Sequence, residues 1–141
     1  MPEIDFAFVA DYVRPEGGVV HAIAAGIDTV YAPVVPTGRN LALLIRLTFS
    51  RAEVGREHRV EVVFQDADGH RLAQVQAAIQ VEWDESLPPG WRQAGVLPLN
   101  AGFPLPHHGI YSFEILINGD SKKSINLRVI PLPDADAGGG G

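Results

Sequence analysis

The chain has 141 residues, of which 46% are hydrophobic and 20% charged, and its formal net charge at pH 7 is -6. This composition is typical of one globular domain and excludes a disordered or fibrous chain. The absence of cysteine excludes disulfide bonds and thiolate chemistry, and the negative charge disfavours nucleic acid and anionic membranes as partners. Without a basic leader or a long apolar run, we expect a cytoplasmic protein.

The first predicted element, residues 4–13, has apolar side chains on both faces, as expected for a strand that is covered on both sides. The glycines at 17–18 predict a turn into a second extended segment, residues 19–25. Gly26 then marks a bend or bulge, and residues 27–31 continue as a strand.

Three segments in the middle of the chain alternate apolar and polar residues with a period of two, which is the pattern of half-buried strands. They are residues 41–49, 59–65 and 74–83. Asp68-Gly69 permits a tight hairpin between the second and the third of them. Residues 82–93 are a proline-stiffened loop with Trp83 and Trp91 near its ends.

Residues 111–117 and 125–129 alternate in the same way, and residues 118–120 supply a tight turn between them. Many strands without helical segments predict an all-β fold, here an antiparallel two-sheet β-sandwich of about 7 to 9 strands. Its topology would be an immunoglobulin-like or jelly-roll-like Greek key. We expect one domain at residues 1–132, followed by a flexible, acidic and glycine-rich tail at residues 133–141.

Several short motifs resemble those of a family of short bacterial domains, largely actinobacterial, whose function is unknown. The chain opens with Phe-x-x-x-Ala-Asp-Tyr at residues 6–12, followed by two glycines and a Gly-x-Asp motif at residues 26–28. An Asp-x-Asp-Gly turn at residues 66–69 and a Pro-Leu-Pro-x-x-Gly-x-Tyr-x-Phe run at residues 104–113 extend the likeness. The resemblance covers most of residues 4–130. It implies a β-sandwich and supplies no activity.

The sequence contains two weak metal-binding patterns and no catalytic one. His107 and His108 are adjacent, so a shared ion would need a loop geometry and a further ligand, such as His21, His58 or His70. The Asp66–Gly69 turn begins like a calcium loop but lacks the closing glutamate. No serine lies in a nucleophile elbow. We therefore expect a protein that is not an enzyme and has no cofactor.

With catalysis and cofactor binding set aside, we expect the chain to function by contact with another protein or with a second copy of itself. Val63, Ala78 and Leu116 interrupt polar strand faces and, together with Trp91, are the candidate contact residues. Val9, Val13 and Leu44 could extend this surface. The alternative function is a module for a small ligand, a carbohydrate or a metal, held between the loop from Trp83 to Trp91 and the His107-His108 turn.

Overall fold

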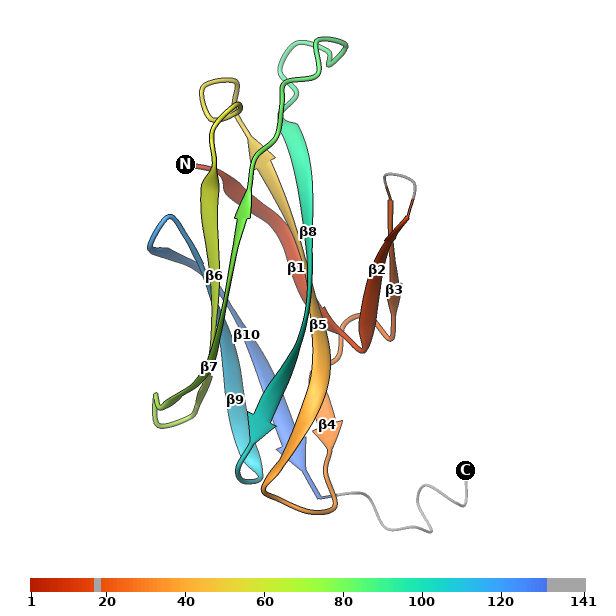
Figure 1. The fold of residues 1–141 in the computed structure, drawn as a ribbon, viewed down its shortest axis with the longest axis vertical. Helices are drawn as coiled ribbons and strands as arrows, with labels where there is room; N and C mark the ends of the chain where they lie inside the picture. Colours follow the sequence, from red (N-terminus) through yellow and green to blue (C-terminus); the bar gives the residue numbers. More distant parts are fainter. Residues whose placement is uncertain (17–18, 132–141) are drawn as a thin grey trace.

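The structure is a computed structural model that describes residues 1–16 and 19–131. Within these residues the chain is all-β and forms ten strands (Figure 1). The predicted turn at 17–18 and the predicted tail at 133–141 lie outside the described residues. The strands are β1 (Glu3–Ala10), β2 (Tyr12–Glu16), β3 (Val19–Ile23), β4 (Thr29–Tyr31), β5 (Thr37–Phe49), β6 (His58–Asp66), β7 (Arg71–Ile79), β8 (Gln93–Leu105), β9 (Gly109–Ile117) and β10 (Asp120–Ile130).

The strands form three sheets, whereas the sequence predicted two antiparallel ones. The first has the order β1-β5-β8, the second β4-β10-β9-β6-β7, and the third is the β2-β3 hairpin. β4 pairs with β10 in parallel, so the five-stranded sheet is mixed. Alternation of apolar residues shows which face of a strand is buried but not the direction of its neighbour, so it predicts neither the parallel pair nor the third sheet. Among the described residues there is no helix that could cross a membrane.

One hydrophobic core joins the three-stranded sheet to the five-stranded sheet. The alternation predicted for residues 41–49, 59–65 and 111–117 is confirmed, because their apolar faces all lie in this core. At its centre, Phe103 of β8 packs against Phe64 of β6 and Phe113 of β9, with ring centroids 5.2 and 5.1 Å apart. These aromatic contacts fix the spacing of the two sheets.

The predicted strand at residues 4–13 is divided into β1 and β2 at Asp11. After this break the β2-β3 hairpin leaves the first sheet and covers part of its outer face. A second small core forms there from Ala10, Val13, Ala42 and Leu44. Cover on both faces was therefore predicted correctly only for Val9, Ala10 and Val13, because Phe6 and Tyr12 are 41% and 48% exposed and β1 is an edge strand.

The strand predicted at residues 74–83 ends at Ile79, and the sequence did not predict β8 at all. Gly95, Pro98, Gly102 and Pro104 obscure the alternation of β8. Within residues 1–16 and 19–131, β8 pairs only with β5 and is an edge strand. Proline is tolerated in an edge strand because the missing N–H can face away from the only partner.

Candidate functional site

The four predicted contact residues do not form one surface. Val63 is only 4% exposed, Leu116 is half-buried, Ala78 is exposed, and Trp91 is 63% exposed in the loop after β7. In the sheet register, Glu61 lies beside Leu116, and Val63 lies between Gln74 and Glu114. Polar side chains therefore interrupt the expected apolar patch. Val9 belongs to the main core, while Val13 and Leu44 lie under the hairpin.

The two parts of the alternative ligand site lie at opposite ends of β8. The loop from Trp83 to Trp91 precedes this thirteen-residue strand, and the His107-His108 turn follows it. The strand separates them by roughly 40 Å, at about 3.3 Å per residue. The structure therefore does not bring the tryptophans and the histidines together.

β7 presents a free edge, because it is the last strand of its sheet and pairs only with β6 among the described residues. We call the unpaired side of residues 72–79 the open edge. Residues 72–81 contain neither a charged residue nor a proline. Natural edge strands usually carry charges, prolines or bulges that prevent pairing with another chain. The open edge of β7 therefore lacks both the charges and the prolines that would prevent such pairing.

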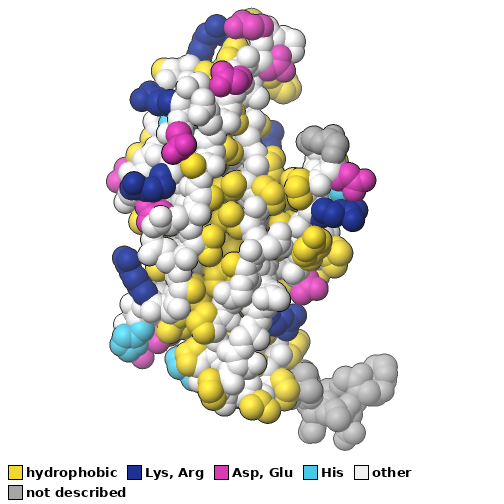
Figure 2. Space-filling view, viewed as in Figure 1, with side chains coloured by type: hydrophobic (Ala, Val, Ile, Leu, Met, Phe, Trp, Pro, Cys, Tyr) yellow, Lys and Arg dark blue, Asp and Glu magenta, His cyan; other side chains and the backbone are white. Residues whose placement is uncertain are grey.

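A seam of half-buried apolar side chains runs beside the open edge, between β7 and β8. It contains Leu72 and Val75 from β7 and Leu97 and Leu99 from β8, all packed against the main core. Figure 2 shows hydrophobic side chains in a long band along this face of the molecule. The uncharged run was visible in the sequence, but its position at a sheet edge follows only from the strand order.

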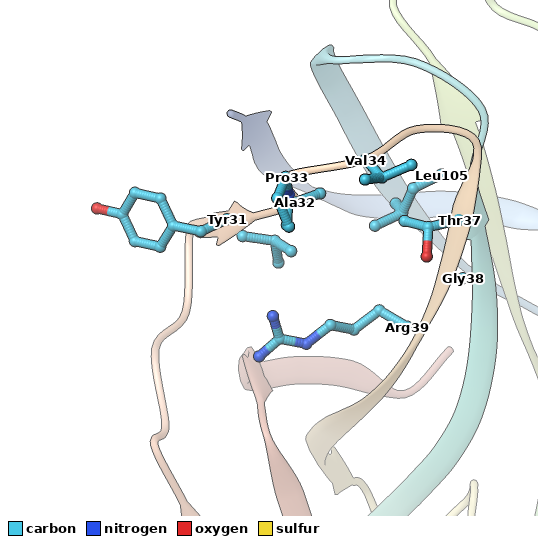
Figure 3. A pocket seen from close by; sticks show the side chains of 9 residues that line it. Tyr31, Ala32, Pro33, Val34, Thr37, Gly38, Arg39 and Leu105 are labelled. Atoms are coloured by element: carbon cyan, nitrogen blue, oxygen red, sulfur yellow. The ribbon is translucent and has the colours of Figure 1, made fainter. Parts of the chain in front are cut away.

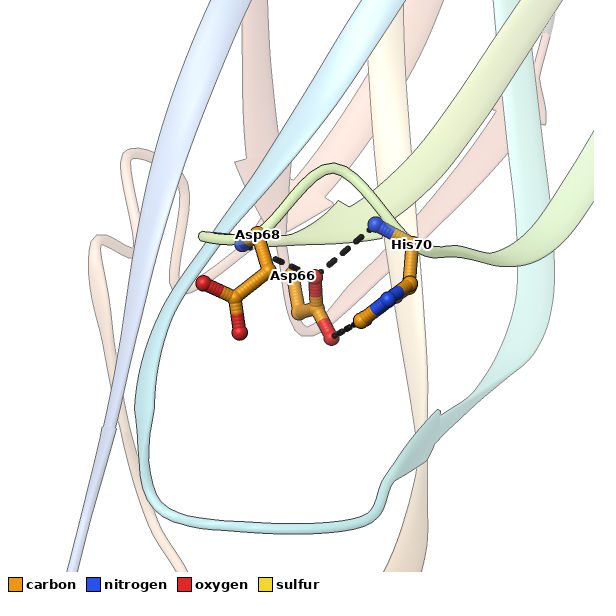
Figure 4. Close-up of side chains that lie close together, drawn as sticks. All are labelled: Asp66, Asp68 and His70. Atoms are coloured by element: carbon orange, nitrogen blue, oxygen red, sulfur yellow. Dashed lines mark hydrogen bonds and ion pairs between the residues drawn. The ribbon is translucent and has the colours of Figure 1, made fainter.

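A cluster of titratable side chains lies where β6 turns into β7 (Figure 4). One oxygen each from Asp66 and Asp68 and one nitrogen of His70 lie within 4.8 Å of one another. His107 lies in the β8-β9 turn, and its Nε2 is 3.6 Å from Oδ2 of Asp66. His108 points elsewhere, because its Nε2 lies 2.8 Å from the carbonyl oxygen of Ala32. The predicted histidine pair is therefore split between two environments.

Asp66 is the buried member of this cluster, with a side chain only 6% exposed. Burial alone would raise the pKa of its carboxyl group. Hydrogen bonds from the backbone and side chain of His70, and from the N–H of Asp68, outweigh burial and lower the pKa below its ordinary value. The carboxylate is therefore anionic at neutral pH.

A small pocket lies beside β4, near the start of β5 (Figure 3). It holds about 170 Å³ and is lined by Tyr31, Ala32, Pro33 and Arg39, among others. Pockets for small organic ligands usually hold about 300–1,000 Å³. The guanidinium of Arg39 also lies 3.6 Å from Oδ1 of Asp11, and this carboxylate compensates the positive charge of Arg39. This pocket therefore gives little support to a small-ligand function.

The fold and these sites define an all-β domain with an open sheet edge and a carboxylate-imidazole cluster at one end. The chain belongs to a family of unknown function (DUF6941), whose model matches residues 5–130. The expected membership of a family of unknown function is confirmed. A search of the curated proteins finds no match.

Among solved structures, the chain is similar to the C-terminal domain of wzt, with a TM-score of 0.51 and 12% identity. The match covers 92% of this chain and 73% of that one. A second match is an alkylpurine DNA glycosylase, AlkC, of Pseudomonas fluorescens, solved bound to DNA containing an abasic site analog. Its TM-score is 0.46 at 10% identity, covering 91% of this chain and 30% of that one. The first likeness concerns the fold alone, and the second is too weak to support an argument.

Proposed function

We propose that the chain is a non-catalytic assembly module in which two copies pair through the open edges of β7. The observation that supports this proposal is the uncharged, proline-free edge at residues 72–79. Two such edges related by a twofold axis pair antiparallel, which is the usual symmetry of a homodimer. The pairing satisfies the unpaired backbone groups of both edges. Two five-stranded sheets then become one continuous sheet.

The charges at the ends of the open edge favour a second copy as the partner. Arg71 begins β7, and Glu82 follows the uncharged run. Antiparallel pairing directs the Arg71 end of each strand toward the Glu82 end of the other. Opposite charges then meet at both ends, although each chain carries a net charge of -6. The uncharged middle of the edge adds no repulsion.

The seam beside the open edge adds apolar area to the proposed interface. Leu97 and Leu99 of β8, like Leu72 and Val75 of β7, pack against the main core and are only partly buried. We expect a second copy that pairs with β7 to cover part of this band as well. Burial of apolar area contributes about 25 cal/mol per Å². The interface therefore combines backbone hydrogen bonds with hydrophobic contact.

We also infer that the two larger sheets are the two layers of a β-sandwich, with the β2-β3 hairpin as an addition. The shared core between the sheets supports this classification. In such an arrangement the edges of both layers, β7 and β8, lie beside each other. Of these two strands only β7 lacks prolines. Of the other two edge strands, β1 carries Glu3 and Asp5 and β4 has only three residues, so β7 is the strand that we expect to pair.

The assembly is tested by the change Gln76→Lys in the middle of the open edge. We expect the natural chain to form dimers whose fraction rises with concentration, as measured by sedimentation velocity at physiological salt. Twofold pairing brings the two introduced lysines close together, and like charges at that position cost about 1 kcal/mol. The dimer should then dissociate roughly fivefold more readily.

The matched control is Asn126→Lys, an exposed position on β10, which β9 and β6 separate from β7 in the same sheet. It changes the net charge by the same amount and should leave the dimer unchanged. A natural chain that stays monomeric at high concentration contradicts self-assembly and makes a different protein the expected partner of this edge. If Gln76→Lys and Asn126→Lys weaken the dimer equally, β7 is not the strand through which the two copies pair.

A further inference from the structure

A second pocket lies where the chain passes from β1 into the β2-β3 hairpin and meets β5 and β8. It is lined by Asp11 and Tyr12 on the hairpin side, by Asn40 from β5, and by Asn100 and Gly102 from β8, among others. We call it the hairpin pocket. It holds about 310 Å³, which lies at the lower end of the range of about 300–1,000 Å³ for pockets that bind small organic ligands.

Hydrogen bonds define the position of the hairpin side of this pocket. Oδ1 of Asn100 accepts a hydrogen bond from the N–H of Val13 at 3.4 Å, and Nδ2 of Asn100 donates to the carbonyl oxygen of Val13 at 3.2 Å. The N–H of Asp11 donates to the carbonyl oxygen of Ile23 at 2.9 Å. The pocket is therefore formed by contacts within the chain, so that a ligand does not have to order it, and the entropy cost of binding is reduced.

Gly102 lines the hairpin pocket from the interior of β8. The pairing of β8 with β5 is regular at this point, and the φ angle of Gly102 is not positive, so neither a bulge nor the backbone conformation requires glycine here. A Cβ atom at this position would come within 3.1 Å of Oδ1 of Asn40. Glycine therefore leaves room for the Asn40 amide at the pocket. A glycine in a strand interior often marks a place where a ligand or another backbone approaches closely.

The two charges at the hairpin pocket compensate each other. Asp11 pairs with Arg39 of β5, with Oδ1 and Nη2 3.6 Å apart, and both side chains are partly exposed. Arg39 therefore repels a cationic ligand. Asp11 and the net charge of -6 on the chain repel an anionic one. The pocket consequently favours a neutral ligand.

The polar side chains of the hairpin pocket suit a ligand that carries several hydroxyl groups. A hydroxyl group both donates and accepts hydrogen bonds, a carboxylate accepts at both oxygens, and an amide donates and accepts. Asp11 and Asn40 are exposed, so their carboxylate and amide are open to a ligand. Tyr12 is 48% exposed and supplies an aromatic ring against which the C–H face of a sugar can pack.

We propose that the hairpin pocket binds a neutral carbohydrate, with Asp11 and Asn40 as the hydrogen-bonding residues and Tyr12 as the aromatic contact. This place differs from the ligand site considered from the sequence, which combined the loop from Trp83 to Trp91 with the His107-His108 turn. It also lies apart from the open edge, because β5 and β8 belong to the three-stranded sheet and β7 to the five-stranded sheet. Carbohydrate binding is therefore independent of the proposed assembly.

Titration of the isotope-labelled full chain with neutral saccharides, followed by NMR spectroscopy, tests the site. The probes are glucose, galactose, mannose, N-acetylglucosamine and maltose, each at up to tens of millimolar. We expect at least one of them to bind with millimolar affinity and to shift the backbone amides of Asp11, Asn40 and Gly102. The changes Asp11→Ala and Asn40→Ala should each weaken this binding roughly tenfold, because each removes hydrogen bonds to the ligand. Circular dichroism should show both variants folded, since both side chains are exposed.

The matched control is Asp5→Ala, because Asp5 is an exposed aspartate that pairs with Arg46 of β5 as Asp11 pairs with Arg39. Arg46 lies roughly 20 Å from Arg39 along the strand, at about 3.3 Å per residue. This variant should bind the saccharide like the natural chain. The proposal is overturned if none of the saccharides binds to the natural chain at tens of millimolar. It is equally overturned if Asp11→Ala and Asn40→Ala bind as tightly as the natural chain, or if Asp5→Ala weakens binding as much as they do.

Discussion

Gly95 lies where no side chain has room. A Cβ atom at this position would come within 2.8 Å of Cγ1 of Val81 and 3.0 Å of Cδ1 of Ile79. The ring of Phe49 would be 3.2 Å away. Glycine therefore allows the start of β8 to approach the end of β7 closely.

We predict that Gly95→Ala lowers the free energy of unfolding by about 1–3 kcal/mol, the usual cost of overpacking. Gly38→Ala is the matched control, because its Cβ would meet only the carbonyl of Phe103 at an ordinary 3.7 Å. Urea denaturation followed by tryptophan fluorescence measures both. Equal effects of the two substitutions would contradict the packing argument.

Glu53 is a buried carboxylate with several hydrogen-bond donors around it. Its Oε1 accepts the backbone N–H of Ser50 at 2.6 Å and the Arg92 guanidinium at 3.1 Å, and Oε2 pairs with the N-terminal ammonium. Burial by itself would raise its pKa. The hydrogen bonds from the N-terminal ammonium and Ser50 outweigh burial and lower the pKa from 4.5 to about 2.

This pKa predicts a specific loss of stability in acid. Since the pKa is lower in the folded chain than in the unfolded chain, Glu53 stabilises the fold fully above pH 4.5. That contribution is lost as the pH falls from 4.5 to about 2. Urea midpoints at pH 7 and pH 3 should therefore differ more for the natural chain than for Glu53→Gln. A variant with the same pH dependence as the natural chain would refute this role.

At the scale of the element, the β2-β3 hairpin depends on its own small core. Val13 is buried against Ala42 and Leu44, apart from the main core. The side chain of Asn100 also accepts from the N–H of Val13 at 3.4 Å and donates to its carbonyl at 3.2 Å. The hairpin is therefore attached through a few contacts and should open separately from the sheets.

We predict that Val13→Ala loosens the hairpin selectively. Loss of two methyl groups costs about 1.5 kcal/mol, which corresponds to roughly tenfold faster local opening. Hydrogen exchange of residues 12–16 and 19–23 should accelerate, while exchange of β6 and β9 stays unchanged. Comparable acceleration in β6 would mean that the hairpin and the main core open together.

The elements that the sequence predicted are those with strict alternation. β5, β6 and β9 have an uninterrupted apolar face because one side of each faces the main core. β8 was not predicted because its glycines and prolines, which are tolerated in an edge strand, obscure the alternation of apolar and polar residues. Residues 80–83 continue the alternation of β7 but lie beyond its end at Ile79, since alternation does not encode where pairing stops.

At the scale of the whole molecule, the candidate sites depend on contacts that no local pattern encodes. Asp66 and His107 are about forty residues apart in the sequence and meet only because β6 and β8 end at the same end of the molecule. The sequence pointed to the adjacent pair His107 and His108 instead. It likewise showed an uncharged segment at residues 72–81 but not its place at the margin of a sheet.

The parallel pairing of β4 with β10 joins an early part of the chain to its last strand. Thr29 to Tyr31 pair with Arg128 to Ile130, and β10 also lies between β4 and β9 in the sheet. During synthesis, β4 and β9 therefore lack their common neighbour until residue 130 has left the ribosome. Such long loops close slowly. We therefore expect a nascent chain to complete the five-stranded sheet only after β10 has been synthesised, and not stepwise from the N-terminus.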